Sequence, residues 1–222
     1  MSPNRILAGL SDEDFALLEP HLEPVDLPVK KRLEVSKRRI DQIYFVEKGF
    51  VSVVANGSNK PSIEVGIIIG REGMTGLSVL LGSERAAHDS YVQVAGKGQR
   101  ISAGNLREVD ERSPTLHRAM LRYANTFLLQ TTTTALANGR SKIEERLARW
   151  LLMAADRVDG KELPLTHEFL GLMLGTYRPG VTKAVQALEK EDLITARRGS
   201  ITILDRRGLE KRSNGTYIRL ED

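Results

Sequence analysis

The spacing of apolar residues changes along the chain, and each change predicts a different kind of structure. Between about residues 25 and 106, Val, Ile and Tyr gather in short stretches such as IYFV at 43–46 and FVSVV at 50–54. Many short strands without helices between them are typical of an antiparallel roll. Glycine-containing sequences predict turns between these strands at Lys48-Gly49, Asn56-Gly57-Ser58, Gly70 to Gly73 and Gly96-Lys97-Gly98.

After Pro114 the apolar residues recur at intervals of three and four, which is the period of one face of a long helix. We expect this helix either to pair with a copy of itself in a homodimer or to pack on its own roll. Asn138-Gly139 is predicted to end it. The candidate dimer-interface residues share this face: Leu116, Met120, Tyr123, Phe127, Gln130 and Thr134.

A second domain is predicted from about Lys142 onward. It begins with a helix, and Thr166 is then a candidate N-cap for a short helix through Leu174. Gly175 supplies the left-handed position that lets the chain turn. A second amphipathic helix follows this turn, with its apolar residues inward and these residues outward: Arg178, Thr182, Lys183, Gln186 and Lys190.

Two short strands around Arg197-Arg198-Gly-Ser complete the pattern of a basic hairpin after the two helices. Helix, turn, polar-faced helix and hairpin together predict a winged helix-turn-helix. A pair of structural helices with a merely solvated outer face is the alternative. The expected fold is therefore α+β, with an N-terminal antiparallel jelly roll at 1–112, a dimerisation helix at 113–138 and a winged helix-turn-helix domain at 139–222.

The distribution of charge favours a polyanionic partner for the C-terminal part. The whole chain of 222 residues has a formal net charge of only +4. From Arg178 to Arg219, however, ten Lys and Arg residues stand against five Asp and Glu residues. A cationic surface there suits the phosphates of double-stranded DNA. Aromatic residues make up 5% of the chain, so the stacking platforms of single-strand and RNA binders are missing.

Several other function classes lack their residues in this sequence. The chain has no cysteine, which excludes disulfides, thiolate metal sites and a cysteine nucleophile. His167-Glu168 begins like a zinc-protease motif, but Gly171 stands where the second histidine ligand belongs. No apolar run approaches the length of a membrane span and the start lacks the core of a signal peptide. We expect a cytoplasmic protein that is not an enzyme.

From about Phe45 to Leu204 the chain resembles bacterial transcription regulators of the Crp/Fnr family. The most specific match is Thr166 through Ile194, and weaker ones are Tyr44-Phe-Val-Glu-Lys-Gly49 and Arg146-Leu-Ala-Arg-Trp-Leu-Leu152. The resemblance implies a homodimer that binds double-stranded DNA and contacts RNA polymerase. It also implies that an effector at the roll and long helix alters the placement of the two recognition helices.

In that family the residue matching Arg178 contacts a guanine, the one matching Lys183 is a basic base or phosphate contact, and the one matching Thr166 contacts a phosphate. Many relatives have a glutamate where this chain has Pro179, so the operator should differ from the usual half-site. The candidate DNA-binding residues are Thr166, His167, Tyr177, Arg178, Thr182, Lys183, Gln186, Lys190, Arg197 and Arg198.

Cyclic-nucleotide-binding relatives hold the ribose with a glutamate and the phosphate with an arginine. Leu77 and Asp89 stand at those places here, so we expect that the roll does not bind cyclic AMP and admits another small effector or none. No cofactor is expected, because without cysteine an iron–sulfur cluster is excluded and the lone histidines His21, His88 and His117 specify no haem. The candidate pocket residues are Thr75, Gly76, Leu77, His88, Asp89, Ser90, Thr131 and Thr132.

Overall fold

The computed structural model describes residues 2–55 and 63–219, and it gives only the backbone of residues 63–66. The chain forms two compact units. The first combines the residues up to Val53 with Ile68–Leu128, and the second is built mainly from Leu129 onward. The predicted turn at Asn56-Gly57-Ser58 lies outside the described residues. The fold is α+β, as the sequence predicts.

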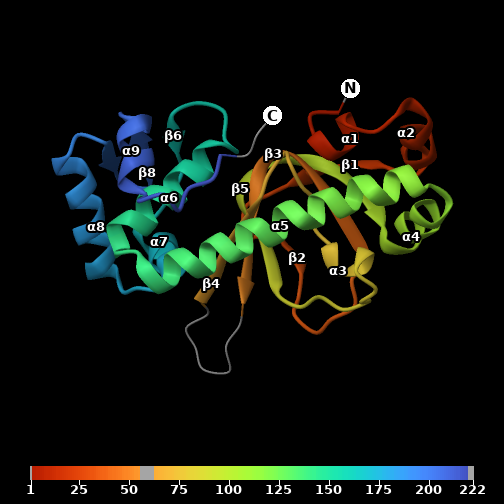
Figure 1. The fold of residues 1–222 in the computed structure, drawn as a ribbon, viewed down its shortest axis with the longest axis horizontal. Coiled ribbons are helices and arrows are strands. Elements are labelled where there is room, and N and C mark those ends of the chain that lie inside the picture. Colours follow the sequence, from red (N-terminus) through yellow and green to blue (C-terminus); the bar gives the residue numbers. More distant parts are fainter. Residues whose placement is uncertain (1, 56–62, 220–222) are drawn as a thin grey trace. The chain divides into compact units, whose positions relative to one another are not determined.

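An antiparallel roll forms the first unit. Its strands have the order β1-β5-β3-β4, and β2 pairs with β5 at Ser90 and Tyr91, outside the stretch that pairs with β1 (Figure 1). The pairing of β1 with β5 runs from Glu23 opposite Arg100 to Leu27 opposite Gly96. The strands are β1 (Glu23–Leu27), β2 (Arg32–Glu34), β3 (Gln42–Ala55), β4 (Ile63–Ile69) and β5 (Asp89–Ser102).

Two of the predicted turns are wrong, because their glycines lie inside long strands. β3 continues through Lys48-Gly49, and β5 continues through Gly96 and Gly98. A side chain at Gly96 would collide with the backbone carbonyl of Lys48. These glycines therefore allow β3 and β5 to approach closely rather than reverse the chain. The turn predicted at 70–73 is confirmed by a hydrogen bond of 3.0 Å from the Gly73 N–H to the Gly70 carbonyl.

Short helices cover the ends of the roll. Ser11 caps α2, since its hydroxyl accepts a hydrogen bond of 3.2 Å from the Asp14 N–H. Apolar residues of these helices, among them Leu18 and Leu106, are fully buried in the core of the roll. The helical segments are α1 (Arg5–Ala8), α2 (Asp12–Leu18), η1 (Glu19–His21), α3 (Leu77–Leu80) and α4 (Ala103–Arg112).

The long helix α5 (Pro114–Arg140) is uninterrupted in Figure 1. It continues through Asn138-Gly139, so the break predicted there is wrong. A single glycine in a helix interior costs only about 1 kcal/mol relative to alanine, which a helix of 27 residues tolerates. The division between the two compact units falls inside α5, between Leu128 and Leu129.

The face of α5 that was predicted to pair with a second copy packs on its own chain instead. Leu116 and Met120 are fully buried in the core of the roll. The hydroxyl of Tyr123 donates a hydrogen bond of 2.8 Å to the Met74 carbonyl, and Phe127 packs against the same core. Side chains that one chain buries in its own core cannot form a surface between two chains. For Leu116, Met120 and Tyr123 the alternative of packing on the roll is confirmed, and Phe127 is partly buried against the same core.

The opposite face of α5 exposes four leucines, which are between 41% and 59% accessible. Leu121 and Leu128 are seven residues apart, and so are Leu129 and Leu136. This interval is two turns of a helix, so the four side chains form one stripe along α5. We call Leu121, Leu128, Leu129 and Leu136 the leucine stripe.

The second unit is a helical domain with a small sheet of order β6-β8-β7. Its core lies between α6 and the helices α7, α8 and α9, which all contact α6 (Figure 1). β6 and α9 are additions to the predicted winged helix-turn-helix. The elements are α6 (Ile143–Ala155), β6 (Glu162–Leu163), α7 (His167–Leu174), α8 (Arg178–Lys190), β7 (Ile194–Arg197), β8 (Ser200–Ile203) and α9 (Arg206–Arg212).

Candidate functional site

The turn between α7 and α8 fixes the entry of α8. The Thr166 hydroxyl caps α7 by accepting a hydrogen bond of 3.2 Å from the Phe169 N–H, and Gly175 adopts the left-handed conformation with φ 57°. The Thr176 N–H then donates to the Gly171 carbonyl at 3.0 Å. A Cβ on Gly171 would lie 3.0 Å from the Thr176 carbonyl oxygen. Glycine at position 171 therefore serves the tight turn, and no metal ligand can stand there.

Packing of α8 on α6 and α7 decides which of its residues face outward. Its buried side chains follow helical spacing and are Val181, Ala184, Val185 and Leu188. Because these four occupy one half of the helix, the polar residues are forced onto the other half. Lys183, Gln186 and Lys190 are exposed in the middle of this outer face, and Arg178 and Thr182 lie at its edge.

The first turn of α8 presents two further groups. Tyr177 occupies the N-cap position and is 82% exposed. Pro179 follows Arg178 in the first turn, where a missing N–H costs no hydrogen bond inside the helix. The Thr182 hydroxyl donates to the Arg178 carbonyl at 3.0 Å, which holds this side chain against its own helix. Arg178, the first residue of α8, is exposed and brings a positive charge to the amino end of the helix.

The hairpin after α8 is the predicted basic wing. β7 and β8 pair from Ile194 opposite Ile203 to Arg197 opposite Ser200, and Gly199 completes the turn with φ 79°. Glu189 anchors the wing to α8, because its Oε1 accepts a hydrogen bond of 2.7 Å from the Ala196 N–H.

Several acidic residues of the second unit form ion pairs with arginines that lie outside α8. Arg212 contacts carboxylates of Glu144, Glu145 and Glu191 at 3.3–3.8 Å. Arg206 binds Asp156 at 2.5 Å and Glu210 at 3.3 Å. Among the described residues, no carboxylate forms an ion pair with the cations of α8 or of the wing turn. Their positive charge is available to a ligand.

The structure therefore places the ten predicted contact residues on three neighbouring elements of the second unit. Thr166 is exposed at the start of α7, and His167 is partly exposed beside it. Arg197 and Arg198 are exposed at the tip of the wing. The remaining six residues are on α8 or at its N-cap: Tyr177, Arg178, Thr182, Lys183, Gln186 and Lys190.

In the roll, a carboxyl group that sequence reasoning missed is bound to two of the residues predicted to form the effector pocket. Glu34 on β2 accepts a hydrogen bond of 3.2 Å from the Gly76 N–H and one of 2.8 Å from the buried Ser90 hydroxyl. Desolvation raises the pKa of Glu34, and these two hydrogen bonds oppose the shift. The Gly76 N–H and the Ser90 hydroxyl, which could otherwise donate to a ligand, are thus already bound to a carboxyl group of the chain itself. A lone acid between Leu33 and Val35 was the only sign of it in the sequence.

The other predicted pocket residues of the roll have structural partners or lie outside the cluster around Glu34. The Thr75 hydroxyl is buried and accepts a hydrogen bond of 3.0 Å from the Tyr44 N–H. Asp89 accepts one of 2.6 Å from the Ser36 N–H. Leu77 starts α3 and packs on the core, whereas His88 is exposed.

Threonines in the second half of α5 return their hydroxyls to the chain. Thr132 is exposed and donates to the Leu129 carbonyl at 3.0 Å, and Thr133 donates to the same carbonyl at 2.8 Å. Thr131 is partly exposed. Thr134 is buried and its hydroxyl accepts a hydrogen bond of 3.0 Å from Arg149. Thr134 thus belongs to the core of the second unit and not to a dimer seam, while Gln130 is partly exposed at the edge of the buried face.

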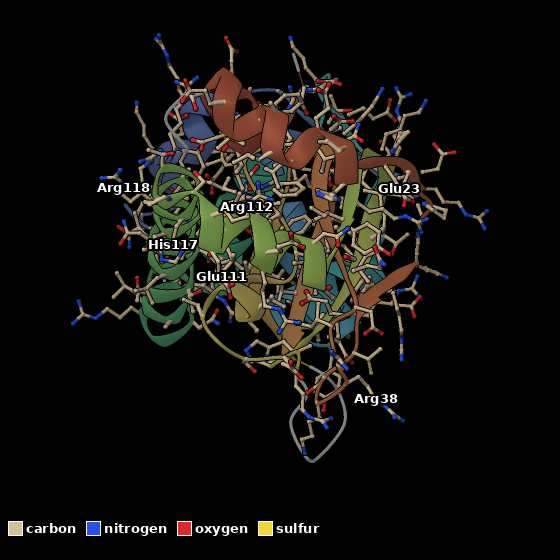
Figure 2. All side chains as sticks on the ribbon, turned by 90° about the vertical axis from the view of Figure 1, so that its right-hand side faces the viewer. Glu23, Arg38, Glu111, Arg112, His117 and Arg118 are labelled. Atoms are coloured by element: carbon tan, nitrogen blue, oxygen red, sulfur yellow. The ribbon has the colours of Figure 1, made fainter. Side chains whose placement is uncertain are left out.

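The described residues contain no cluster of His, Cys, Asp and Glu that could hold a metal ion. His117 lies with Arg112 and Arg118 near the corner between α4 and α5 (Figure 2). Its Nδ1 is 2.8 Å from a carboxylate oxygen of Asp110, which is an ordinary partner for a surface histidine.

No helix in the described parts of the chain is long and apolar enough to cross a membrane.

Residues 145–212 match the family model of the Crp-like helix-turn-helix domain. This stretch runs from the first turn of α6 to the end of α9 and contains all ten predicted contact residues. None of the curated protein sequences matches the chain significantly.

Solved structures of several bacterial regulators have the same fold. FixK2 from Bradyrhizobium japonicum has a TM-score of 0.74 at 15% identity, over 90% of this chain and 99% of that one. The c-di-GMP-responsive global regulator CLP from Xanthomonas campestris has 0.72 at 16%, over 88% and 100%. TTHB099, a CRP-family transcriptional regulator from Thermus thermophilus, has 0.70 at 19%, over 87% and 97%. At these identities the similarity shows the fold.

A pH dependence of stability follows from Glu34. Since folding raises its pKa, the carboxyl favours the folded state when protonated, and this contribution is lost as the pH rises through the folded value. We predict that the free energy of unfolding of the protein falls relative to that of Glu34→Gln as the pH rises above about 4, the ordinary pKa of a glutamate side chain. Urea unfolding of both proteins measures this, and parallel pH profiles would contradict it.

Proposed function

We propose that this chain, a Crp/Fnr-type protein with a Crp-like helix-turn-helix domain, is a sequence-specific DNA-binding transcription regulator. The observation that carries the proposal is the outer face of α8. Its cations have no carboxylate partner in the described chain, and its buried residues Val181, Ala184, Val185 and Leu188 are turned inward. A helix of this kind at the second position of a helix-turn-helix enters the major groove.

The residues divide by the part of the duplex that they suit. Arg178 at the amino end of α8 has the planar donor fork that binds guanine O6 and N7. Lys183 and Gln186 follow on the same face, where side chains reach base edges. Thr166 and the wing cations Arg197 and Arg198 suit phosphates, which position the protein without specifying sequence. Contacts of both kinds are needed for a regulator with a defined operator.

Pro179 distinguishes this chain from many relatives. It lies on the exposed side of the first turn, beside Arg178. A proline offers neither a carboxylate nor an amide to a base, so it cannot accept a hydrogen bond from a cytosine amine. The operator is therefore proposed to differ from the usual family half-site at the base pair that faces this position.

The functional form is proposed to be a homodimer formed through the leucine stripe. Leu121 and Leu128 alternate with the exposed polar residues Asn125 and Thr132 at intervals of three and four residues. Polar residues at such positions lower stability but fix the register of a two-stranded coiled coil. A twofold dimer carries two copies of α8, which suits operators with two half-sites about one helical turn, roughly 34 Å, apart.

The roll is proposed not to use cyclic AMP. Glu34 already accepts from the Gly76 N–H and the Ser90 hydroxyl, and its carboxylate would repel a cyclic phosphate. Effector control then depends on another ligand that binds one arrangement of the dimer better than the other. The hydroxyls of Thr132 and Thr133, which are returned to their own helix, favour the second candidate, a regulator that binds DNA without an effector.

Two further properties are proposed from the resemblance alone. The protein acts in the cytoplasm, where its duplex lies, and it contacts RNA polymerase. It is proposed to act by binding and not as an enzyme.

Duplex binding tests the proposed function. A duplex selected from a random pool should be bound as a near-palindrome. Arg178→Ala should then cost about 1–3 kcal/mol, almost entirely at one base pair of each half-site. Lys190→Ala should weaken binding to all sequences alike and reduce the salt dependence. Fluorescence anisotropy with labelled duplexes at several salt concentrations measures both effects.

Lys97→Ala is the matched control, because it removes an exposed cation from the roll. We expect it to leave duplex affinity unchanged. A wild-type protein that selects no sequence, or that binds single strands as tightly as duplexes, would show that the proposed function is wrong.

The molecular mass of the protein in solution tests the proposed dimer. Leu128 is 59% exposed, so Leu128→Glu should leave the fold of each chain intact while placing a charge in the proposed interface. Analytical ultracentrifugation should show a dimer for the wild-type protein and a monomer for Leu128→Glu. Thr126→Glu adds the same charge to α5 away from the leucine stripe and should remain dimeric. A Leu128→Glu variant with the mass of a dimer would exclude this interface.

Thermal unfolding tests the exclusion of cyclic AMP. A ligand at one hundred times its dissociation constant stabilises a protein by about 2.7 kcal/mol. We expect millimolar cyclic AMP to leave the melting temperature of the wild-type protein unchanged. A rise of several degrees, absent with AMP as the control, would show that the roll accepts the cyclic phosphate despite Glu34.

A further inference from the structure

A small cavity lies within the second unit where the carboxyl end of α5 meets α6 and α7. Its volume is about 10 Å³, which is room for a single particle of about the size of a water molecule. The residues of its wall that bear on its chemistry are Thr134 and Asn138 from α5, and Arg146, Arg149 and Trp150 from α6; Leu174 at the end of α7 also lines it.

Arg149 brings a buried positive charge to this wall. The residue is 6% exposed, and its guanidinium donates to the Thr216 carbonyl at 2.9 Å and to the Thr134 hydroxyl at 3.0 Å. Both acceptors are neutral. Burial, together with the charge of Arg157, lowers the pKa of Arg149 to about 10. The protein therefore holds this cation at an electrostatic cost that its two hydrogen bonds do not remove.

Arg146 adds a second guanidinium one turn earlier on α6. It donates to the Leu174 carbonyl at 2.7 Å, and burial lowers its pKa as well. Neither Arg146 nor Arg149 forms an ion pair with a carboxylate in the described parts of the chain. The nearby acids of α6, Glu144 and Glu145, are bound to Arg212 instead. Two cations thus share one wall without a counter-ion.

The other polar groups of the wall also favour a negatively charged ligand. Guanidinium and indole groups can only donate hydrogen bonds, and the Asn138 amide and the Thr134 hydroxyl can donate as well as accept. Among the described residues, no carboxylate lines the cavity. Donors and positive charge around a cavity of single-ion dimensions are the environment that a small anion requires.

We propose that this cavity binds one small monovalent anion of the chloride type, held between the Arg146 and Arg149 guanidinium groups. The anion supplies the counter-charge that the described chain lacks there. Since the wall combines residues of α5, α6 and α7, the bound ion ties the end of the long helix to the first helix of the helix-turn-helix. This site is independent of the DNA-facing residues of α8.

Trp150 gives a direct test, because it is the single tryptophan of the chain, is 2% exposed and lines the cavity. Bromide resembles chloride in size and charge but quenches indole fluorescence, whereas chloride does not. The full-length protein is titrated with sodium bromide at constant ionic strength against sodium gluconate, without DNA. We expect quenching that saturates and that added chloride reverses. Weak quenching that rises linearly and ignores chloride would overturn the proposal.

Variants locate the effect at the cavity. Arg149→Gln removes one of the two cations and should abolish the saturable, chloride-sensitive quenching. Arg140→Gln removes an exposed cation at the end of α5 and should retain it. If Arg149→Gln does not fold, Arg146→Gln provides the same comparison from the partly exposed side of the wall. Saturable quenching that survives the loss of a wall arginine would place the bromide site elsewhere and contradict the assignment.

The outcome is separable from the proposed function. The titration contains no nucleic acid, and the substituted arginines are not among the residues that face the duplex. Failure of the bromide test leaves duplex binding untouched, and failure of duplex binding leaves a saturable bromide site intact.

Discussion

The burial of four residues of α8 is the constraint on which the rest of the second unit depends. Val181, Ala184, Val185 and Leu188 can reach the core only when one side of the helix faces α6 and α7. A fully buried aliphatic side chain contributes about 1.5–3 kcal/mol, so rotating α8 about its axis would forfeit most of the stability of a small domain. The outward direction of Lys183, Gln186 and Lys190 is thus a consequence of packing.

The same unit arranges its charges so that this face stays positive. Arg206 and Arg212 pair with Glu144, Glu145, Asp156, Glu191 and Glu210, whose charges would otherwise weaken the positive field around α8. The roll differs in this respect. Its Gly76 N–H and Ser90 hydroxyl could otherwise donate to a ligand, but both are hydrogen-bonded to the Glu34 carboxyl group. The two units therefore differ in what they leave free for a partner. The second unit has exposed cations without carboxylate partners, which suit a polyanion. In the roll, the Gly76 N–H and the Ser90 hydroxyl already have a partner in Glu34.

Sequence reasoning was most successful where a residue type has a single local use. Thr166 as a cap, Gly175 in the left-handed region and the wing turn at Gly199 follow from backbone chemistry. It was wrong where the role of a residue depends on distant parts of the chain. Gly96 has the same local appearance as a turn glycine, and only the approach of β3 shows its use. The spacing of apolar residues predicted that α5 has distinct faces, but it did not show which face packs on the roll. No feature of the sequence indicated that the Glu34 side chain points inward.

The central claim is that the outer face of α8 lies in the major groove of a duplex, once for each subunit. Protection of guanine N7 from methylation by dimethyl sulfate tests it most directly, since N7 is exposed only in that groove. On the selected operator we predict protected guanines in two clusters, about one helical turn apart, that become reactive again with Arg178→Ala. Guanines that stay fully reactive while the operator is saturated with protein would contradict the account.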